Sequence, residues 1–203
     1  MQNKSEEFVT LYRKANPLPE ARAKVPLIQV GDNFLCESLV VSEYVAGIYS
    51  SSLIPKDPNE RSRMRLFTEL CGSAFSYFPL VRAAQGEGDF EAALKTFQEG
   101  LVNANSFLAS GSSASGPFCL GNEFSLAECT LAPFVQRCCT ILPAFAEVDP
   151  LALCDKLKLT YLKAWIGAVL ERPSVVTTGV APDAMIASTT KMLERFAAMA
   201  KTK

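Results

Sequence analysis

The first fifty residues contain two stretches in which apolar positions recur at helical spacing. The first covers 5–15, where Ser5 is a suitable N-cap and Asn16-Pro17 ends the pattern. The second covers 39–48 and ends before a loop of serines at 50–52. Both stretches predict helices, and the region between them has a different pattern.

Two short apolar runs between these helices predict a β-hairpin. The runs cover 25–30 and 34–36, and they flank Gly31-Asp32-Asn33, whose residues tolerate the positive φ of a tight turn. This is the one convincing hairpin in the sequence.

Beyond Pro58 the pattern is helical, with no internal repeat. Glycine, proline and serine clusters at 86–88, 110–117 and 143–149, together with Arg172-Pro173, separate the helices. The helices are expected over 59–84, 89–109, 125–142, 150–170 and 182–200.

These elements predict an α/β plus all-α fold. A small α/β domain over 1–50 is followed by an all-helical domain over 58–203. Two strands cannot bury both faces of a sheet, so the first domain looks incomplete.

Charge and composition remove several classes of function. The 203 residues include 20 basic and 21 acidic side chains, a balance that gives no reason to expect nucleic acid or an anionic membrane as a partner. Histidine is absent, which excludes a Ser/His/Asp triad and His-ligated zinc or haem. The remaining candidate partners are small molecules and other proteins, and no metal is expected.

The cysteines indicate a reducing compartment. There are seven, an odd number, with no C-x-x-C pair, and most have apolar neighbours. The N-terminus is polar and acidic, unlike a signal peptide, and the apolar run 129–145 contains Gln136, Arg137 and two prolines, which argues against a membrane span. We expect a cytoplasmic protein.

One cluster near the hairpin has the chemistry of a ligand site. If the Val25-Pro26 bond is cis, Val25 can offer its backbone N–H and C=O to a ligand instead of a strand. Glu37-Ser38 places a carboxylate and a hydroxyl beside the N–H groups of a helix start, which suits an α-amino-acid moiety. Alternatively, Glu37 or Ser38 is only a helix cap and Pro26 an ordinary edge proline.

Two further features have a structural interpretation. Ser125 and Glu128 form the S-x-x-E pattern of a capping box at the start of an apolar helix. Trp165 lies on the apolar stripe of a later helix, where a packing role is favoured over a substrate platform.

Together these motifs resemble the glutathione S-transferase superfamily, and the resemblance covers essentially the whole chain. The chain is most similar to omega-type members (thiol transferase or dehydroascorbate reductase-like), because Asn3-Lys4-x-Glu6-x-Phe8 and Asn16-Pro17 precede the Val-Pro pair. The motifs that carry the resemblance are Val25-Pro26-Leu27, Glu37-Ser38 with Val41, Glu43 and Tyr44, Leu53-Ile54-Pro55-Lys56-Asp57, Leu120-Gly121-Asn122, Ser125-Leu126-Ala127-Glu128, Leu162-Lys163-Ala164-Trp165 and Glu171-Arg172-Pro173-Ser174-Val175.

The resemblance implies an incomplete thioredoxin-like N-terminal domain, which holds glutathione as co-substrate. A glutathione-transferase-type helical C-terminal domain would wall the second-substrate pocket. Val25 would pair with the cysteinyl backbone of glutathione with Pro26 cis, and Glu37 and Ser38 would hold its γ-glutamyl end. Lys4 matches a position that contacts the tripeptide in omega-like proteins, and Ser125 is the cap on which the folding of the helical domain depends.

The resemblance also implies that the catalytic residue lies outside this sequence. The family's first β-α-β unit carries a catalytic Cys, Ser or Tyr, and by this comparison it is expected upstream of Met1. Strand alternation puts Cys36 on the face opposite Glu37, where a buried hydrophobe is favoured over a reactive thiol. Tyr12 and Tyr77 are possible hydroxyl donors that the sequence alone does not place.

Two functions are therefore expected. The first is a glutathione transferase that performs conjugation or glutathione-dependent thiol transfer on a small hydrophobic or thiol/disulfide substrate, with a role in detoxification. The second is a non-catalytic subunit of the same fold that serves as a binding or assembly module, since an exposed sheet edge invites burial against another chain. A homodimer or a protein complex is expected in either case.

Overall fold

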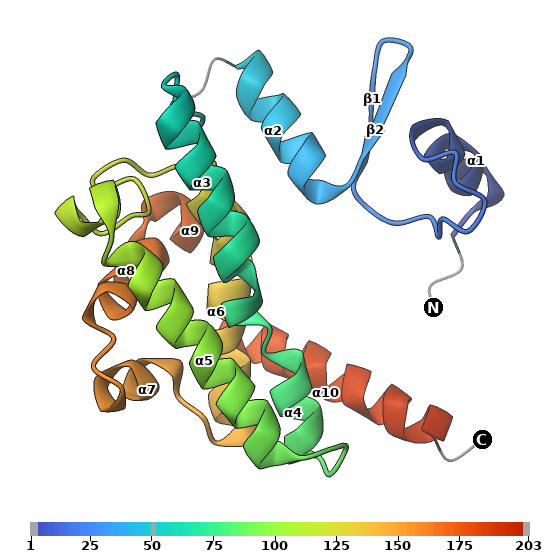
Figure 1. The fold of residues 1–203 in the computed structure, drawn as a ribbon. Coiled ribbons are helices and arrows are strands. Elements are labelled where there is room, and N and C mark those ends of the chain that lie inside the picture. Colours follow the sequence, from blue (N-terminus) through green and yellow to red (C-terminus); the bar gives the residue numbers. More distant parts are fainter. Residues whose placement is uncertain (1–3, 50–51, 201–203) are drawn as a thin grey trace. The chain divides into compact units, whose positions relative to one another are not determined.

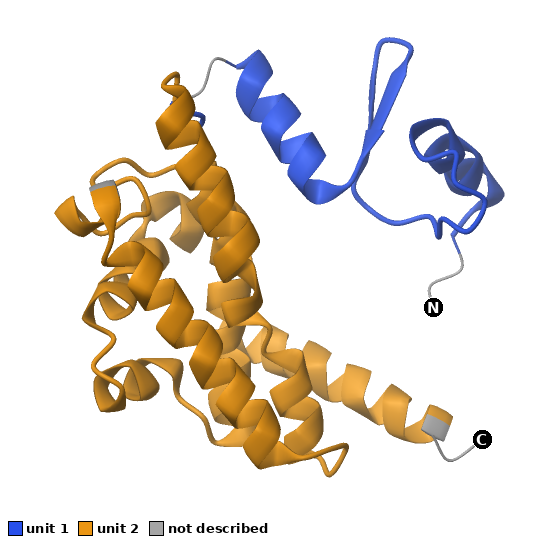
Figure 2. Cartoon of the chain, viewed as in Figure 1, with its two compact units in different colours: residues 1–54 blue, residues 55–203 orange. Residues whose placement is uncertain are grey.

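The computed structural model describes residues 4–49 and 52–200, in two compact units, 1–54 and 55–203 (Figure 2). The predicted fold class is confirmed, because the chain is mostly helical with one two-stranded sheet in its first unit (Figure 1). Asn3 of the omega-like motif and Ser50 and Ser51 of the predicted loop lie outside the described residues.

In unit 1, helix α1 (Glu6–Ala15) has the predicted ends. The Phe8 amide donates to Ser5 Oγ at 3.2 Å, and the Asn16 amide donates to the Tyr12 carbonyl at 2.9 Å. Acidic residues lie in its first turn and basic residues in its last, the arrangement that the helix dipole favours.

The predicted hairpin is also present. Strands β1 (Leu27–Val30) and β2 (Asn33–Cys36) pair antiparallel, with Leu27 opposite Cys36 and Val30 opposite Asn33. Gly31 has φ +59°, which its missing Cβ permits at low cost. Both α1 and the following helix α2 (Ser38–Ile48) contact β2.

Unit 2 begins with α3 (Pro58–Cys71), which is capped by Asp57. The single helix predicted over 59–84 is wrong. The chain instead forms a 3-10 turn, η1 (Gly72–Phe75), and a separate helix, α4 (Phe78–Ala84), with a proline in its first turn. The apolar pattern continues through this bend because η1 is itself buried, so periodicity did not reveal the break.

Helix α5 (Phe90–Leu108) is followed by η2 (Gly111–Ser115) and a turn, and this segment is attached to Arg63 of α3. The Arg63 guanidinium stacks over the Phe107 ring at 4.4 Å. It also donates to the carbonyls of Phe107 (3.0 Å), Cys119 (3.3 Å) and Ser110 and to Ser113 Oγ (2.6 Å).

Helix α6 (Leu126–Ala146) is longer than the predicted 125–142. Pro143 does not end it, and the helix stops at Glu147, which has a left-handed backbone with φ +54°. By length and composition α6 alone among the described helices could cross a membrane, a test that the core helix of a soluble protein also passes.

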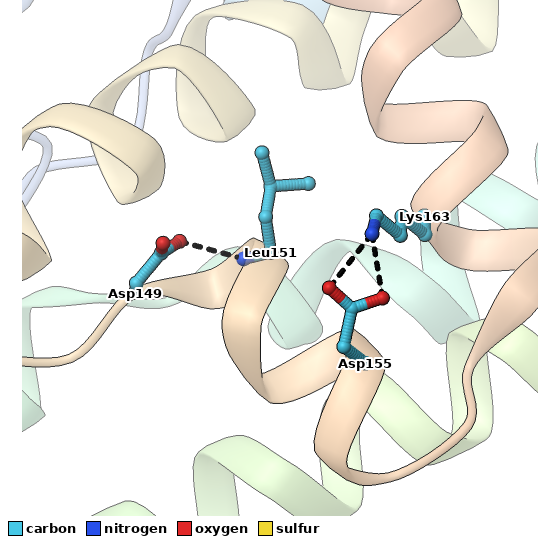
Figure 3. Close-up of polar contacts among 4 residues, drawn as sticks. All are labelled: Asp149, Leu151, Asp155 and Lys163. Atoms are coloured by element: carbon cyan, nitrogen blue, oxygen red, sulfur yellow. Dashed lines mark hydrogen bonds and ion pairs between the residues drawn. The ribbon is translucent and has the colours of Figure 1, made fainter.

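The helix predicted over 150–170 is two helices, α7 (Pro150–Lys156) and α8 (Thr160–Glu171), separated where Lys158 has φ +57°. Asp149 caps α7 by accepting from the Leu151 amide at 2.8 Å, and Lys163 of α8 pairs with Asp155 of α7 (Figure 3). The short α9 (Pro173–Thr178) was not predicted, and α10 (Pro182–Ala200) has the predicted bounds.

The core of unit 2 lies between α3, α5, α6 and α8 (Figure 1), where α3 and α8 each contact both α5 and α6. Trp165 is fully buried at its centre, as its packing interpretation required. Its ring lies edge-on to Phe67 and stacked on Phe75, both at 5.4 Å between ring centroids.

Candidate functional site

The open end of the hairpin brings two of the candidate motifs together. Because Leu27 pairs with Cys36, the next residues outward are Pro26 on one strand and Glu37 on the other. The Val25–Pro26 peptide bond is cis, and Val25 is 75% exposed. Within 4–49 and 52–200, the backbone of Val25 makes no hydrogen bond, so its N–H and C=O are available to a ligand.

Glu37 and Ser38 begin α2 without acting as ordinary caps. Glu37 has φ +68°, an uncommon backbone for a residue with a side chain, and its carboxylate makes no capping hydrogen bond. Both residues are exposed, and the Ser38 hydroxyl has no partner in the part of the chain that the structure describes. The capping alternative therefore does not account for these two side chains.

The Tyr12 hydroxyl contacts the Glu37 carboxylate, and the sequence analysis did not predict this contact. The Tyr12 hydroxyl donates to Glu37 Oε1 at 3.3 Å, and Tyr12 is only 2% exposed. Burial raises the pKa of Tyr12, so the hydroxyl remains a donor at neutral pH. Twenty-five residues separate the pair, and no local sequence pattern signals a contact at that range.

Lys4 and Cys36 both lie close in the chain or through a hydrogen bond to the residues of this site. Lys4 Nζ donates to the Ala23 carbonyl at 2.6 Å, two residues before Val25, and lies over the Phe8 ring. These contacts hold Lys4 to Ala23 and Phe8, and neither contact involves Glu37 or Ser38. Cys36 is buried, as strand alternation predicted.

Ser125 and Glu128 form a complete capping box at the start of α6. The Ser125 amide donates to Glu128 Oε2 at 2.9 Å, and the Ala127 amide donates to Ser125 Oγ at 3.3 Å. Glu128 Oε1 also accepts from the Cys119 amide at 2.9 Å and from Trp165 Nε1 at 3.0 Å. The pair therefore has a structural role in the core of unit 2.

Unit 2 contains a cavity of about 380 Å³ on one face of α6. The helix contributes residues at i, i+3, i+4, i+7 and i+8, and α9 with the start of α10 closes the other side. Its lining is mostly apolar and comprises Phe124, Cys129, Ala132, Pro133, Gln136, Arg137, Ser174, Val175, Thr178, Gly179, Val180 and Met185.

Gln136 and Arg137 are the longest polar side chains of this cavity. The sequence analysis did not assign these two residues to a pocket. A signal was present, since they interrupt the apolar run 129–145. A polar pair inside an otherwise apolar helix indicates either a satisfied core network or a cavity wall.

Six of the seven thiols are poor candidates for a nucleophile. Burial raises the pKa of each of them, to about 11 for Cys71 and Cys154 and about 12 for Cys139. The same effect raises the pKa of Cys119, Cys129 and Cys138. At neutral pH these groups are thiols rather than reactive thiolates.

Comparison with known proteins identifies this architecture. Residues 81–168, from α4 to α8, match the family described as "Glutathione S-transferase, C-terminal domain". The chain is 28% identical over 130 residues to a probable maleylacetoacetate isomerase 1 of Drosophila melanogaster, covering 62% of this chain and 50% of that protein. It is 28% identical over 137 residues to maleylacetoacetate isomerase of Rattus norvegicus, covering 66% and 58%. The chain thus spans little more than half the length of these relatives.

Solved structures show the same fold. A Tau class glutathione S-transferase from mango (Mangifera indica) has a TM-score of 0.71 at 19% identity, covering 94% of this chain and 82% of that one. A trimeric glutathione transferase of Leishmania has a TM-score of 0.67 at 21% identity, covering 87% and 38%. Residues 81–168 of unit 2 thus resemble a glutathione S-transferase C-terminal domain, and the chain has the fold of these glutathione transferase structures.

Proposed function

We propose that this chain binds glutathione at the open end of the hairpin and acts in a glutathione-dependent reaction on a small organic substrate. One observation carries the proposal. Val25, whose backbone makes no hydrogen bond within 4–49 and 52–200, lies at the same end of the hairpin as Glu37 and Ser38, whose exposed side chains do not cap α2. The relatives named above are enzymes, which favours this function over a non-catalytic subunit.

The residues present suit the parts of glutathione. The N–H and C=O of Val25 would pair with the extended cysteinyl backbone, as one strand pairs with another. The Glu37 carboxylate would accept from the γ-glutamyl ammonium group. The Ser38 hydroxyl and the N–H groups at the start of α2 would donate to the α-carboxylate, where the helix dipole also favours a negative charge.

Within this proposal the chain binds and orients the tripeptide, and glutathione supplies the reacting thiol. The buried thiols of unit 2 keep their protons and take no part in exchange. The reaction is conjugation or thiol transfer of the kind first expected, or isomerisation, the activity named for the relatives in fly and rat.

Titration calorimetry of the 203-residue chain with glutathione tests the binding. We expect saturable binding that weakens about 10- to 100-fold in Glu37→Gln and in Ser38→Ala, since a hydrogen bond to a charged group contributes about 1.5–3 kcal/mol. Glu20→Gln and Ser42→Ala remove the same groups from exposed positions of unit 1 and should bind normally. Equal affinity in all four variants would contradict the proposal.

Activity assays then separate the reaction types. Conjugation is followed with 1-chloro-2,4-dinitrobenzene, thiol transfer with a mixed disulfide of glutathione, and isomerisation with maleylacetoacetate, each with and without glutathione. Loss of the glutathione-dependent rate in Glu37→Gln, with Glu20→Gln unchanged, would support the site. A rate independent of glutathione would count against it.

The finer expectations from the resemblance stay proposals. They are the omega-type class, a homodimer or protein complex, a role in detoxification and a cytoplasmic location. Light scattering of the purified chain measures its state of association and so tests the homodimer.

A further inference from the structure

We propose that Tyr12 is a positioning residue of the hairpin site: its hydroxyl holds one oxygen of the Glu37 carboxylate, so that the other oxygen can accept from the γ-glutamyl ammonium group of glutathione. This role rests on the proposed function, because it concerns how Glu37 meets its ligand. Both residues lie within unit 1.

Tyr12 is held on several sides. It is a buried residue of α1, and its ring centroid lies 6.4 Å from that of Phe8, one turn earlier on the same helix. Helix α1 contacts β2, the strand that ends directly before Glu37. The side chains of Asn16 and Cys36 also interact with the Tyr12 hydroxyl. A ring packed in this way keeps its hydroxyl in one place.

Glu37 has no comparable support of its own. It is exposed, it has φ +68°, and its side chain makes no capping hydrogen bond to α2. In the described part of the chain, the Tyr12 hydroxyl is the one hydrogen-bonding partner of this carboxylate, 3.3 Å from Oε1. An exposed glutamate otherwise samples several rotamers, and a ligand that fixes it loses affinity to the lost entropy. The Tyr12 contact therefore orders the carboxylate before glutathione binds.

A tyrosine orients the carboxylate without competing for its charge. An ionised carboxylate accepts hydrogen bonds at both oxygens, and the Tyr12 hydroxyl uses Oε1. Burial raises the pKa of Tyr12, so this donor is uncharged at neutral pH. A lysine or arginine in its place would pair with the carboxylate and compete with the ammonium group of the ligand. The full charge of Glu37 is thus left for the ligand.

A positioning role and a merely structural role predict different outcomes when the hydroxyl is removed. If the hydroxyl only stabilised unit 1, its loss would weaken every ligand of the hairpin site in equal proportion. If it positions Glu37, its loss weakens only ligands that carry the ammonium group.

The test is titration calorimetry of the 203-residue chain with glutathione and with N-glutaryl-cysteinylglycine, which lacks only the α-amino group. We expect Tyr12→Phe to weaken glutathione about 3- to 10-fold, the net contribution of one hydrogen bond, and to leave the affinity for the analogue unchanged. Tyr49→Phe removes a hydroxyl from an exposed position of unit 1 and should change neither affinity. Circular dichroism checks that each variant is folded.

A double-mutant cycle with Glu37→Ala assigns the effect to the pair. No carboxylate remains to be positioned in that background, so adding Tyr12→Phe should weaken glutathione no further. Losses that simply add would show that Tyr12 affects binding independently of Glu37, which would overturn the role.

A second measurement needs neither a ligand nor a variant. Scalar couplings across χ1 of Glu37, measured by NMR on the unliganded protein, should show one dominant rotamer. In Tyr12→Phe the couplings should move to averaged values. A Glu37 side chain that is already averaged over rotamers in the unchanged protein would overturn the positioning role.

The outcomes also separate this role from the proposed function. If the unchanged protein does not bind glutathione, the proposed function and the role of Tyr12 both fail. If it binds glutathione and Tyr12→Phe binds equally well, only the role of Tyr12 fails. The same holds if the variant loses affinity for glutathione and for the analogue in equal proportion.

Discussion

Glu128 shows how one buried side chain can do more than its sequence motif predicts. The motif predicts a bond to the Ser125 amide, but the carboxylate also accepts from Ser125 Oγ, the Cys119 amide and Trp165 Nε1. All four partners are donors, which suits a group that only accepts when ionised. One residue thus joins the start of α6, the preceding turn and the core tryptophan of α8.

Glu128→Gln is therefore expected to destabilise the protein although the two side chains have nearly the same shape. The amide NH2 must face donors at one of the two oxygen positions, which leaves buried groups unpaired and costs about 2–3 kcal/mol. Urea unfolding followed by circular dichroism measures the change. Glu123→Gln, at an exposed position in the preceding turn, serves as the control and should change stability little.

Buried thiols give the stability of the fold a dependence on alkaline pH. Burial raises the pKa of Cys154 to about 11, and the nearby Asp155 and Asp149 carboxylates add to the increase. The unfolded thiol has a pKa of about 8.5, so the unfolded state releases its proton first. The stabilisation is complete below about pH 8.5 and is lost as the pH rises towards about 11.

We expect the free energy of unfolding to fall between pH 8.5 and 11, and to fall less steeply in Cys154→Ala. Urea titrations at a series of pH values give the two slopes, and their difference isolates this thiol from lysines and tyrosines that ionise in the same range. Identical slopes would show that Cys154 has the same pKa in both states.

Among the elements, α5 and η1 approach each other closely through their backbones at Gly100. A Cβ built at Gly100 would lie 2.9 Å from Ala74 Cα, a contact that the backbone must move to relieve. Gly100→Ala should therefore destabilise the protein by about 1–2 kcal/mol, because overpacking outweighs the gain of about 1 kcal/mol in helix propensity.

The matched control for Gly100 is Gly167→Ala in α8, where an added Cβ meets nothing within 4 Å. That variant should be neutral or more stable by up to about 1 kcal/mol. Thermal unfolding of both variants measures the contrast. A stable Gly100→Ala would mean that η1 shifts freely against α5.

Sequence patterns predicted elements well where local chemistry fixes them. The Ser5 cap, the Gly31 turn and the capping box at Ser125 all depend on a few neighbouring residues. The break after Cys71 and the continuation through Pro143 depend on how buried segments pack in three dimensions. Periodicity reports burial, and it does not report whether the backbone bends within a buried stretch.

The residues of the candidate sites also differ in whether local sequence or the three-dimensional fold reveals them. Val25, Glu37 and Ser38 were named as candidates from motifs, because a Val-Pro pair and a helix start are local features of the sequence. Their link to Tyr12 and the cavity beside Arg137 needed the fold, since both join residues far apart in the chain.

At the scale of the whole molecule, the two units differ in the amount of core they contain. Among the described residues of unit 1, the buried hydrophobic side chains are Tyr12, Cys36 and Ala46. Unit 2 has one contiguous cluster that runs from Met64 to Val169. Burial of apolar surface is the main stabilising term in folding, so the units should differ in local stability.

Hydrogen exchange followed by mass spectrometry tests this difference on the 203-residue chain. Peptides from α1, the hairpin and α2 should exchange at least about 100-fold faster than those from α5, α6 and α8. Equal protection in both units would mean that unit 1 opens only when the whole chain unfolds.

Arg63 holds the segment 110–119 through bonds that salt weakens little. The partners described above are carbonyl and hydroxyl oxygens, which carry no net charge for dissolved ions to screen. By contrast, the exposed Arg82–Glu87 pair joins two opposite charges in contact with solvent. Added salt will weaken that surface pair while α3 keeps its hold on the segment.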